Sequence, residues 1–320
     1  MLILQESLSA LNTFYYLLRK AGILLLSLFG VVTLTFVLMH SIPGDPFLQE
    51  QAIPEEILRS LYHYYGLDQP WHVQYLRYLK GIITWDLGPS FKYEGRTVNQ
   101  IISSGFPVSF YLGMMALFIA VTLGTVLGMI SAWHRNKWQD HLAAIFSVLG
   151  ISVPSFLIAT LLQYIFCIKL QLLPVARWGT FLHTILPALS MAALPMAFIA
   201  RLTRTSMVEV LQQDYILTAR SKGLSSVRLL MKHVMRNSIL PVVTYIGPLT
   251  ASILTGSFVV EKIFAIPGLG YWFVMSVSNR DYTVILGVTV FYSCLLMCCI
   301  FFVDIVYTLI DPRIRTALRR

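Results

Sequence analysis

The feature that most constrains this chain is a run of 19 residues without a single charge, from Ala21 to Met39. As an α-helix rising 1.5 Å per residue it would be about 28 Å long, which matches the hydrocarbon core of a bilayer. A cleavable leader has a shorter apolar stretch that ends at a small-residue site, and none precedes His40. We therefore expect a retained membrane span.

Five further apolar runs predict five more transmembrane helices, which makes six. These runs cover residues 109–133, 141–167, 185–200, 239–260 and 282–309. Charged residues make up only 12% of the chain and hydrophobic residues 57%, whereas a soluble domain carries about 25% charged residues. We predict an all-α integral membrane protein whose exterior is covered by membrane lipid.

Lys and Arg are unevenly distributed over the segments between these runs. With the N-terminus in the cytoplasm, 15 of the 24 Lys and Arg residues but only five of the 15 acidic residues fall on the inner side. Cytoplasmic loops of membrane proteins carry such an excess. We predict cytoplasmic N- and C-termini, and the net charge of +9 then reflects topology and predicts no nucleic-acid partner.

This topology divides the chain into five parts. Residues 1–20 are an N-terminal cytoplasmic segment, 21–40 the first span and 41–107 a long outer loop. Residues 108–310 form the transmembrane core, with an inner loop at 201–238, and residues 311–320 a cytoplasmic tail. In the second span, Gly124 and Gly128 have the GxxxG spacing that lets helices approach closely, and we expect an internal packing seam there.

The inner loop predicts two short helices joined by a glycine. Asp214 to Lys222 has an acid in its first turn and cations in its last, as a helix dipole favours. Gly223 is placed to end that helix, and Ser225 or Ser226 to cap a second one that runs to about Arg236. Two helices this short must pack on something, so they favour a docking surface over a solvated loop.

This helix–glycine–helix element resembles the cytoplasmic loop of ATP-binding-cassette importer permeases of the dipeptide/oligopeptide/nickel family. The matching residues are Thr218, Ala219, Arg220, Lys222 and Gly223, followed by His233, Arg236, Asn237 and Pro241. The general importer pattern opens with Glu-Ala-Ala, whereas this chain has Leu217, Thr218 and Ala219, a departure that is usual in the peptide group.

Other stretches resemble the same family and occur in its order. They are IPGDP at 42–46, GLDQP at 66–70 with Gln74 and Tyr75, DLGPS at 86–90, ISVPSF at 151–156, PGLG at 267–270, NRDY at 279–282 and DPRIR at 311–315. The likeness is to the first permease of the pair, which has the long outer loop after its first span.

The resemblance implies a multi-pass permease of the bacterial cytoplasmic (inner) membrane that imports di- or oligopeptides and is not itself an enzyme. Its implied partners are a second permease subunit, two ATPase subunits and an extracytoplasmic peptide-binding protein. ATP and Mg would be bound by the ATPases, because this chain has no GxxxxGK[ST] phosphate loop. We expect no cofactor and no metal on this chain.

Two groups of site residues follow from the resemblance. The coupling loop would dock on the ATPase through Asp214, Tyr215, Thr218, Ala219, Arg220, Lys222, Gly223, Leu224 and His233. Ala219 and Gly223 would permit close approach to the ATPase, and Arg220 and Lys222 would meet acidic groups on it. A gate on the outer side would involve Glu261, Pro267, Gly268 and Gly270.

Three questions stay open in the sequence. An ATP-independent secondary transporter or channel could use Asp304, an acid inside the sixth span, although that residue also fits a structural ion pair near the inner end. A membrane enzyme is disfavoured because no catalytic constellation is evident. The substrate could be a dipeptide, a longer peptide or a nickel chelate, and the two permeases could be different or identical chains.

Overall fold

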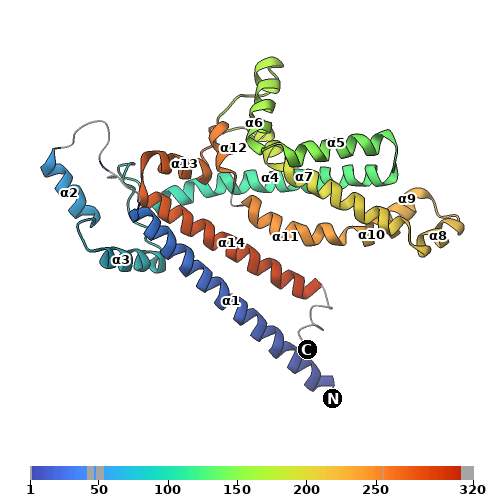
Figure 1. Cartoon of the computed structure of the whole chain (residues 1–320), viewed down its shortest axis with the longest axis horizontal. Coiled ribbons are helices and arrows are strands. Elements are labelled where there is room, and N and C mark those ends of the chain that lie inside the picture. Colours follow the sequence, from blue (N-terminus) through green and yellow to red (C-terminus); the bar gives the residue numbers. More distant parts are fainter. Residues whose placement is uncertain (1, 42–46, 48–53, 255, 311–320) are drawn as a thin grey trace. The chain divides into compact units, whose positions relative to one another are not determined.

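The computed structural model describes residues 2–41, 47, 54–254 and 256–310, which form helices and connecting loops without a β-strand beyond one isolated bridge (Figure 1). The IPGDP and DPRIR stretches and the predicted tail at 311–320 lie outside these residues. The chain divides into two units: Met1–Val108 with Gly268–Arg320, and Ser109–Pro267. Each unit is described by itself.

Four helical segments are long and apolar enough to cross a membrane. They are Leu18–Ser41, Val98–Trp133, Leu182–Leu211 and Tyr282–Ile305, and two bent helix pairs would bring the number of spans to six. All six predicted spans therefore have a helical counterpart among the described residues, although the third is broken and the fifth begins at a bend.

Two long helices, α1 (Leu2–Ser41) and α14 (Tyr282–Ile310), pack against each other in the first unit. They run in opposite directions and lie side by side in Figure 1, with α13 (Leu269–Asn279) packed on α14. The helix α1 runs without a break through residue 20, so the predicted start of the first span stays a prediction about the membrane boundary. No Pro or Gly occurs before Gly22, so nothing interrupts the helix there.

The described part of the predicted outer loop contains a pair of shorter helices, α2 (Glu55–Tyr65) and α3 (Trp71–Thr84). The Gln-Tyr pair of the GLDQP stretch attaches α3 to α1. The Gln74 side chain pairs with the His40 ring at 3.0 Å, and the Tyr75 hydroxyl with Thr33 at 2.6 Å. These polar contacts fix the second helix of the outer loop on the first span.

Asp281, which precedes α14, joins two of the sequence stretches that identify the family. Its buried carboxylate accepts hydrogen bonds from the Ser90 hydroxyl at 2.5 Å and the Phe91 amide at 3.2 Å. It also accepts from Thr283 and from the Val284 amide in the first turn of α14. The DLGPS and NRDY stretches thus meet at one buried acid, which caps a helix and holds a loop.

The second unit is built around α7 (Leu182–Leu211). A side chain at Gly124 or Gly128 of α4 (Val98–Trp133) would lie 2.8 Å from the Met196 carbonyl or 2.5 Å from the Ala200 carbonyl of α7. Gly150 of α5 (Trp138–Ser152) likewise faces α7, where a Cβ would lie 2.8 Å from Ala197. The predicted GxxxG seam is therefore confirmed as internal packing.

The third predicted span is broken. Between α5 and α6 (Ser155–Gln163), which continues as a π-helix over Tyr164–Lys169, the axis turns by 109°. Pro154 lies at this break, and it can neither donate a hydrogen bond to α5 nor let Val153 remain helical. Residues 141–167 thus form helical segments on either side of a break, which the hydrophobic run did not indicate.

A bend of 52° lies between the segment Ser226–Ser238 and α11 (Leu240–Leu254), at the beginning of the fifth predicted span over residues 239–260. Pro241 lies in the first turn of α11, where proline is tolerated. The unit ends with α12 (Phe258–Ile263), a short helix whose Ser257 hydroxyl accepts from the Val260 amide.

Candidate functional site

The helix–glycine–helix element is present in the second unit. The first helix, α8 (Asp214–Ser221), is followed by Lys222 and by Gly223 at φ 75°. That left-handed conformation is easily adopted by glycine and ends the helix, as predicted. The second helix has three parts, α9 (Ser226–Leu229), a π-turn over Leu230–Val234, and α10 (Met235–Ser238). Ser225 has the extended N-cap backbone, but its side chain makes no capping hydrogen bond.

One face of this element is buried in the chain's own core. A cluster joins α8 to the second helix and to the inner ends of α4 and α7, and its members are Ala132, Met207, Ile216, Ala219, Leu229 and Val234. Ala219 is only 8% exposed. The small Ala219 side chain therefore packs inside this unit, and its expected close approach to a partner protein stays a prediction.

The structure gives a reason for glycine at residue 223 within the chain itself. A Cβ placed on Gly223 would meet no other atom of the described chain within 4 Å, but its φ of 75° favours glycine. The expected close approach of Gly223 to a partner stays a prediction.

The remaining predicted docking residues divide by exposure. Asp214, Tyr215, Thr218, Arg220 and Lys222 are exposed, whereas Leu224 and His233 are half-buried. Three large apolar side chains beside them are also exposed: Leu217 at 54%, Val227 at 72% and Met231 at 62%. We call these eight exposed residues the inner-loop surface. Apolar side chains among cations are typical of a surface that is covered by a partner protein.

Tyr215 links the two helices of the element. Its hydroxyl accepts a hydrogen bond of 2.7 Å from the side-chain amide of Asn237 in α10. Because α8 is only eight residues long, such side-chain contacts and the buried cluster hold it in place, since short helices are marginal alone.

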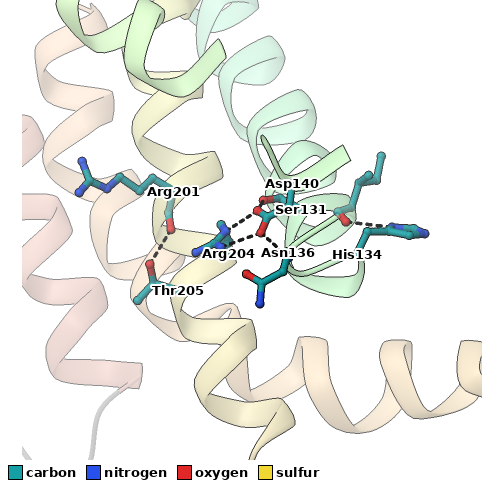
Figure 2. A network of polar contacts seen from close by, with 8 residues as sticks. Ser131, His134, Asn136, Asp140, Arg201, Arg204 and Thr205 are labelled. Carbon is teal, nitrogen blue, oxygen red and sulfur yellow. Dashed lines mark hydrogen bonds and ion pairs between the residues drawn. The ribbon is translucent and has the colours of Figure 1, made fainter. Parts of the chain in front are cut away.

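The sequence did not predict a buried ion pair between α5 and α7, two helices of the same unit (Figure 2). Asp140 of α5 is 3% exposed, and both of its carboxylate oxygens are bonded by Arg204 of α7, at 2.6 and 2.8 Å. The Ser131 hydroxyl of α4 donates at 2.6 Å and the Asn136 amide at 2.9 Å. A planar guanidinium facing a carboxylate in this way forms a strong and directional contact.

This ion pair joins the inner ends of three helices, α4, α5 and α7. The nearby Arg201 side chain points away from it in Figure 2, and the Thr205 hydroxyl donates to the Arg201 carbonyl. Together with the buried cluster, the pair makes α8–α10 and these helix ends one packed body. The sequence predicts only that Asp140 and Arg204 lie on the same side of the membrane, and no spacing signal relates residues 64 positions apart.

The predicted gate residues lie in both units, and each is described within its own. In the second unit, Glu261 of α12 is fully buried and accepts a 2.9 Å hydrogen bond from the Ser109 hydroxyl, while Pro267 is exposed. In the first unit, Gly268 is the N-cap of α13 and Gly270 lies in that helix, both buried. The stretch forms two short helices, and a gate role for it stays a prediction.

Asp304 forms an ion pair with Lys20 across the α1–α14 contact of the first unit. Both side chains are partly buried, at 19% and 27% exposure. The pairing favours the structural reading of this acid over that of an ion-coupling site, because the carboxylate is already matched by a cation of the neighbouring helix.

Comparison with known proteins places the chain among transport proteins. The family model described as binding-protein-dependent transport system inner membrane component matches residues 124–316, and a model for the N-terminal part of such components matches residues 13–113. The dipeptide transport system permease protein DppB of Bacillus subtilis is 52% identical over 300 residues, which cover 94% of this chain and 97% of that protein.

Two further matches agree. The oligopeptide transport system permease protein OppB of Haemophilus influenzae is 43% identical over 291 residues, covering 90% of this chain and 95% of that one. A solved structure of the MetNI methionine ABC transporter in an inward-facing conformation matches with a TM-score of 0.52 at 16% identity, over 69% of this chain and 97% of that one. At so low an identity the likeness concerns the fold alone.

Proposed function

This chain belongs to the family of binding-protein-dependent transport system inner membrane components, and from that premise we propose that it is a permease subunit of an ATP-driven peptide importer. The curated relatives named above are dipeptide and oligopeptide permeases and are matched over almost their whole length, which supports di- or oligopeptides as the substrate. The chain would form the translocation path together with a second permease subunit.

The single observation that carries the proposal is the inner-loop surface. It is displayed by two helices whose opposite face is packed on the ends of α4 and α7. A partner that moves α8 would therefore move these helices with it. We propose that the partner is an ATPase subunit, one of two that bind ATP and Mg, and that the chain itself catalyses no reaction.

The proposed orientation places this surface in the cytoplasm of a bacterial cell, in the inner membrane. It is supported by the excess of Lys and Arg among the inner segments. The outer loop with α2 and α3 then faces an extracytoplasmic peptide-binding protein. The runner-up, an ATP-independent carrier using Asp304, is disfavoured by the Lys20 pair and gives the inner-loop surface no role.

Co-purification tests the proposal most directly. The tagged chain is extracted from its own membranes in mild detergent, and the co-purifying proteins are identified by mass spectrometry. We expect a second permease and an ATPase with a phosphate loop. Val227→Glu, which places a charge at a 72% exposed apolar position, should release the ATPase but retain the second permease.

A matched control is Val259→Glu, at a 50% exposed apolar position of α12 in the same unit, which should retain the ATPase. The complex is then reconstituted in liposomes for peptide uptake. A chain that purifies alone and accumulates peptide down an ion gradient without ATP would contradict the proposal.

A further inference from the structure

The first unit contains a cavity of about 460 Å³, enclosed by α1, α2, α3, the segment after α3 and the start of α14. Six aromatic side chains form much of its wall: Phe36, Tyr64, Tyr65, Tyr78, Phe91 and Tyr282. Both the volume and the mainly apolar lining are in the range of sites that bind small molecules. The cavity belongs to the first unit, whereas the inner-loop surface belongs to the second.

Two opposite charges also line this cavity, Arg77 of α3 and Asp86 just after it. Within the described part of the chain, Arg77 makes no hydrogen bond or ion pair, and the Asp86 carboxylate accepts only from the Gly88 amide, at 3.3 Å. The two charges are not paired with each other. They are therefore available to a ligand that brings one charge of each sign.

Two other polar side chains of the wall, His40 and Gln74, are already engaged, whereas the buried Tyr78 hydroxyl has no hydrogen-bond partner among the described residues. The His40 ring contacts the Phe36 carbonyl and Gln74, each at 3.0 Å. The Gln74 amide donates to the carbonyls of Leu67 and Gln69. These groups shape the wall, and the ionic recognition is left to the guanidinium and the carboxylate.

Two glycines, Gly66 and Gly81, lie close to these two charged residues. Gly66 has φ 69°, and a Cβ there would lie 1.9 Å from the Arg77 guanidinium, so the turn between α2 and α3 leaves room for that group. A Cβ on Gly81 would lie 2.6 Å from the Asp86 carbonyl, so the backbone that carries the carboxylate packs directly on α3. The Arg77 guanidinium thus lies beside the turn at Gly66, and the backbone of Asp86 lies against α3.

We infer that this cavity binds a small zwitterionic peptide, with Arg77 facing its carboxylate, Asp86 its ammonium group, and the aromatic wall its apolar side chains. The inference rests on the proposed function and adds to it a peptide site on the permease itself, at the outer end of the chain. Charge-assisted hydrogen bonds would orient the peptide at both ends. A ligand with only one charge would leave the other charge of the site unmatched, which weakens binding.

The test uses the reconstituted complex and a photoreactive dipeptide, benzoylphenylalanine-alanine with free termini. After illumination, the labelled positions are mapped by mass spectrometry. We expect labels on α3, on residues 86–91 or at the start of α14. Arg77→Gln and Asp86→Asn should each lower this labelling about tenfold, as expected when a hydrogen bond to a charged group is lost. Lys80→Gln, exposed on α3 and outside the cavity wall, should label like the unaltered protein.

A second measurement needs no variant and so does not depend on how a variant folds. Acetylating the amine or amidating the carboxylate of the probe should each reduce labelling of the unaltered complex about tenfold. Equal labelling by free and capped probes would overturn the inference, as would labels only outside the cavity. If the same complex still takes up peptide when ATP is supplied, the proposed function stands even though the inference fails. Absence of ATP-driven uptake in the unaltered complex would instead overturn the proposed function.

Discussion

At the scale of single residues, Gly223 should be replaceable only by residues that accept a positive φ. Its φ is 75°, and a side chain there would meet open space. Alanine or valine should therefore destabilise the turn by about 1–2 kcal/mol through the backbone alone. We expect Gly223→Ala and Gly223→Val to retain less ATPase in pull-downs, and Gly223→Asn to stay nearest to the unaltered chain.

Gly22→Ala is the matched control, because Gly22 lies within the regular helix α1 and its Cβ would also meet nothing within 4 Å. It should leave ATPase recovery unchanged. If Gly223→Asn lost the ATPase as fully as Gly223→Val, the glycine would be required by contact with the partner and not by its φ.

The Asp140–Arg204 pair should stabilise the inner ends of α4, α5 and α7. Asp140→Asn weakens the bonds to Arg204 in a buried place, and we expect a loss of about 2 kcal/mol in the free energy of unfolding. Thermal unfolding in detergent should show a melting temperature lower by about 4–8 °C.

A double-mutant cycle isolates the pair from its surroundings. Arg204→Leu leaves Asp140 buried and unpaired, and should destabilise strongly by itself. The double variant Asp140→Asn with Arg204→Leu should then be less destabilised than the sum of the two single variants. If the loss of unfolding free energy in the double variant equalled the sum of the losses in the two single variants, the two side chains would not interact in solution.

At the scale of elements, the sequence predicted which segments are helical better than how they bend. Each of the six hydrophobic runs corresponds to helical structure, and the glycine spacing at 124 and 128 predicted close packing. The 109° turn at Pro154 was not predicted, because membrane helices often accommodate proline through contacts with neighbouring helices. Likewise Ala219 was assigned to a partner, because a small residue in a docking helix suits an inner or an outer contact equally well.

The α1–α14 pair should depend on Lys20 and Asp304. Lys20→Ala leaves a partly buried carboxylate without its cation, and we expect a loss of about 1 kcal/mol in stability. Exchanging the residues, Lys20→Asp with Asp304→Lys, should recover most of it, as measured by the yield of monodisperse protein and by melting temperature.

Transport separates this structural role from ion coupling. Asp304→Asn should keep ATP-driven uptake when the rate is expressed per folded complex. A variant that folds as well as the unaltered protein but has lost all uptake would return Asp304 to the transport mechanism.

At the scale of the whole molecule, composition and charge distribution were enough to predict a helical membrane protein with several spans, because a bilayer admits few alternatives. The contacts that build the two units were not predictable. Ser90 and Asp281 are 191 positions apart in the sequence. Such long separations are common in membrane proteins, where the two partners of a contact come from distant segments. The resemblance of short stretches showed which residues matter in the family, while only the structure shows that two of those stretches bind each other.

The orientation of the chain is predicted by its charges and can be measured directly. Its four cysteines, Cys167, Cys294, Cys298 and Cys299, are first replaced by serine or alanine. A single cysteine is then placed at exposed Glu56 of α2 or at exposed Val227 of α9. With the excess of Lys and Arg inside, a membrane-impermeant maleimide should label Glu56→Cys in intact spheroplasts, and Val227→Cys only after permeabilisation.

Adding the unlabelled ATPase subunit to permeabilised membranes should then protect Val227→Cys but leave Glu56→Cys accessible. Labelling of Val227→Cys from outside would place the inner-loop surface away from the ATP of the cytoplasm and would exclude a cytoplasmic ATPase as its partner.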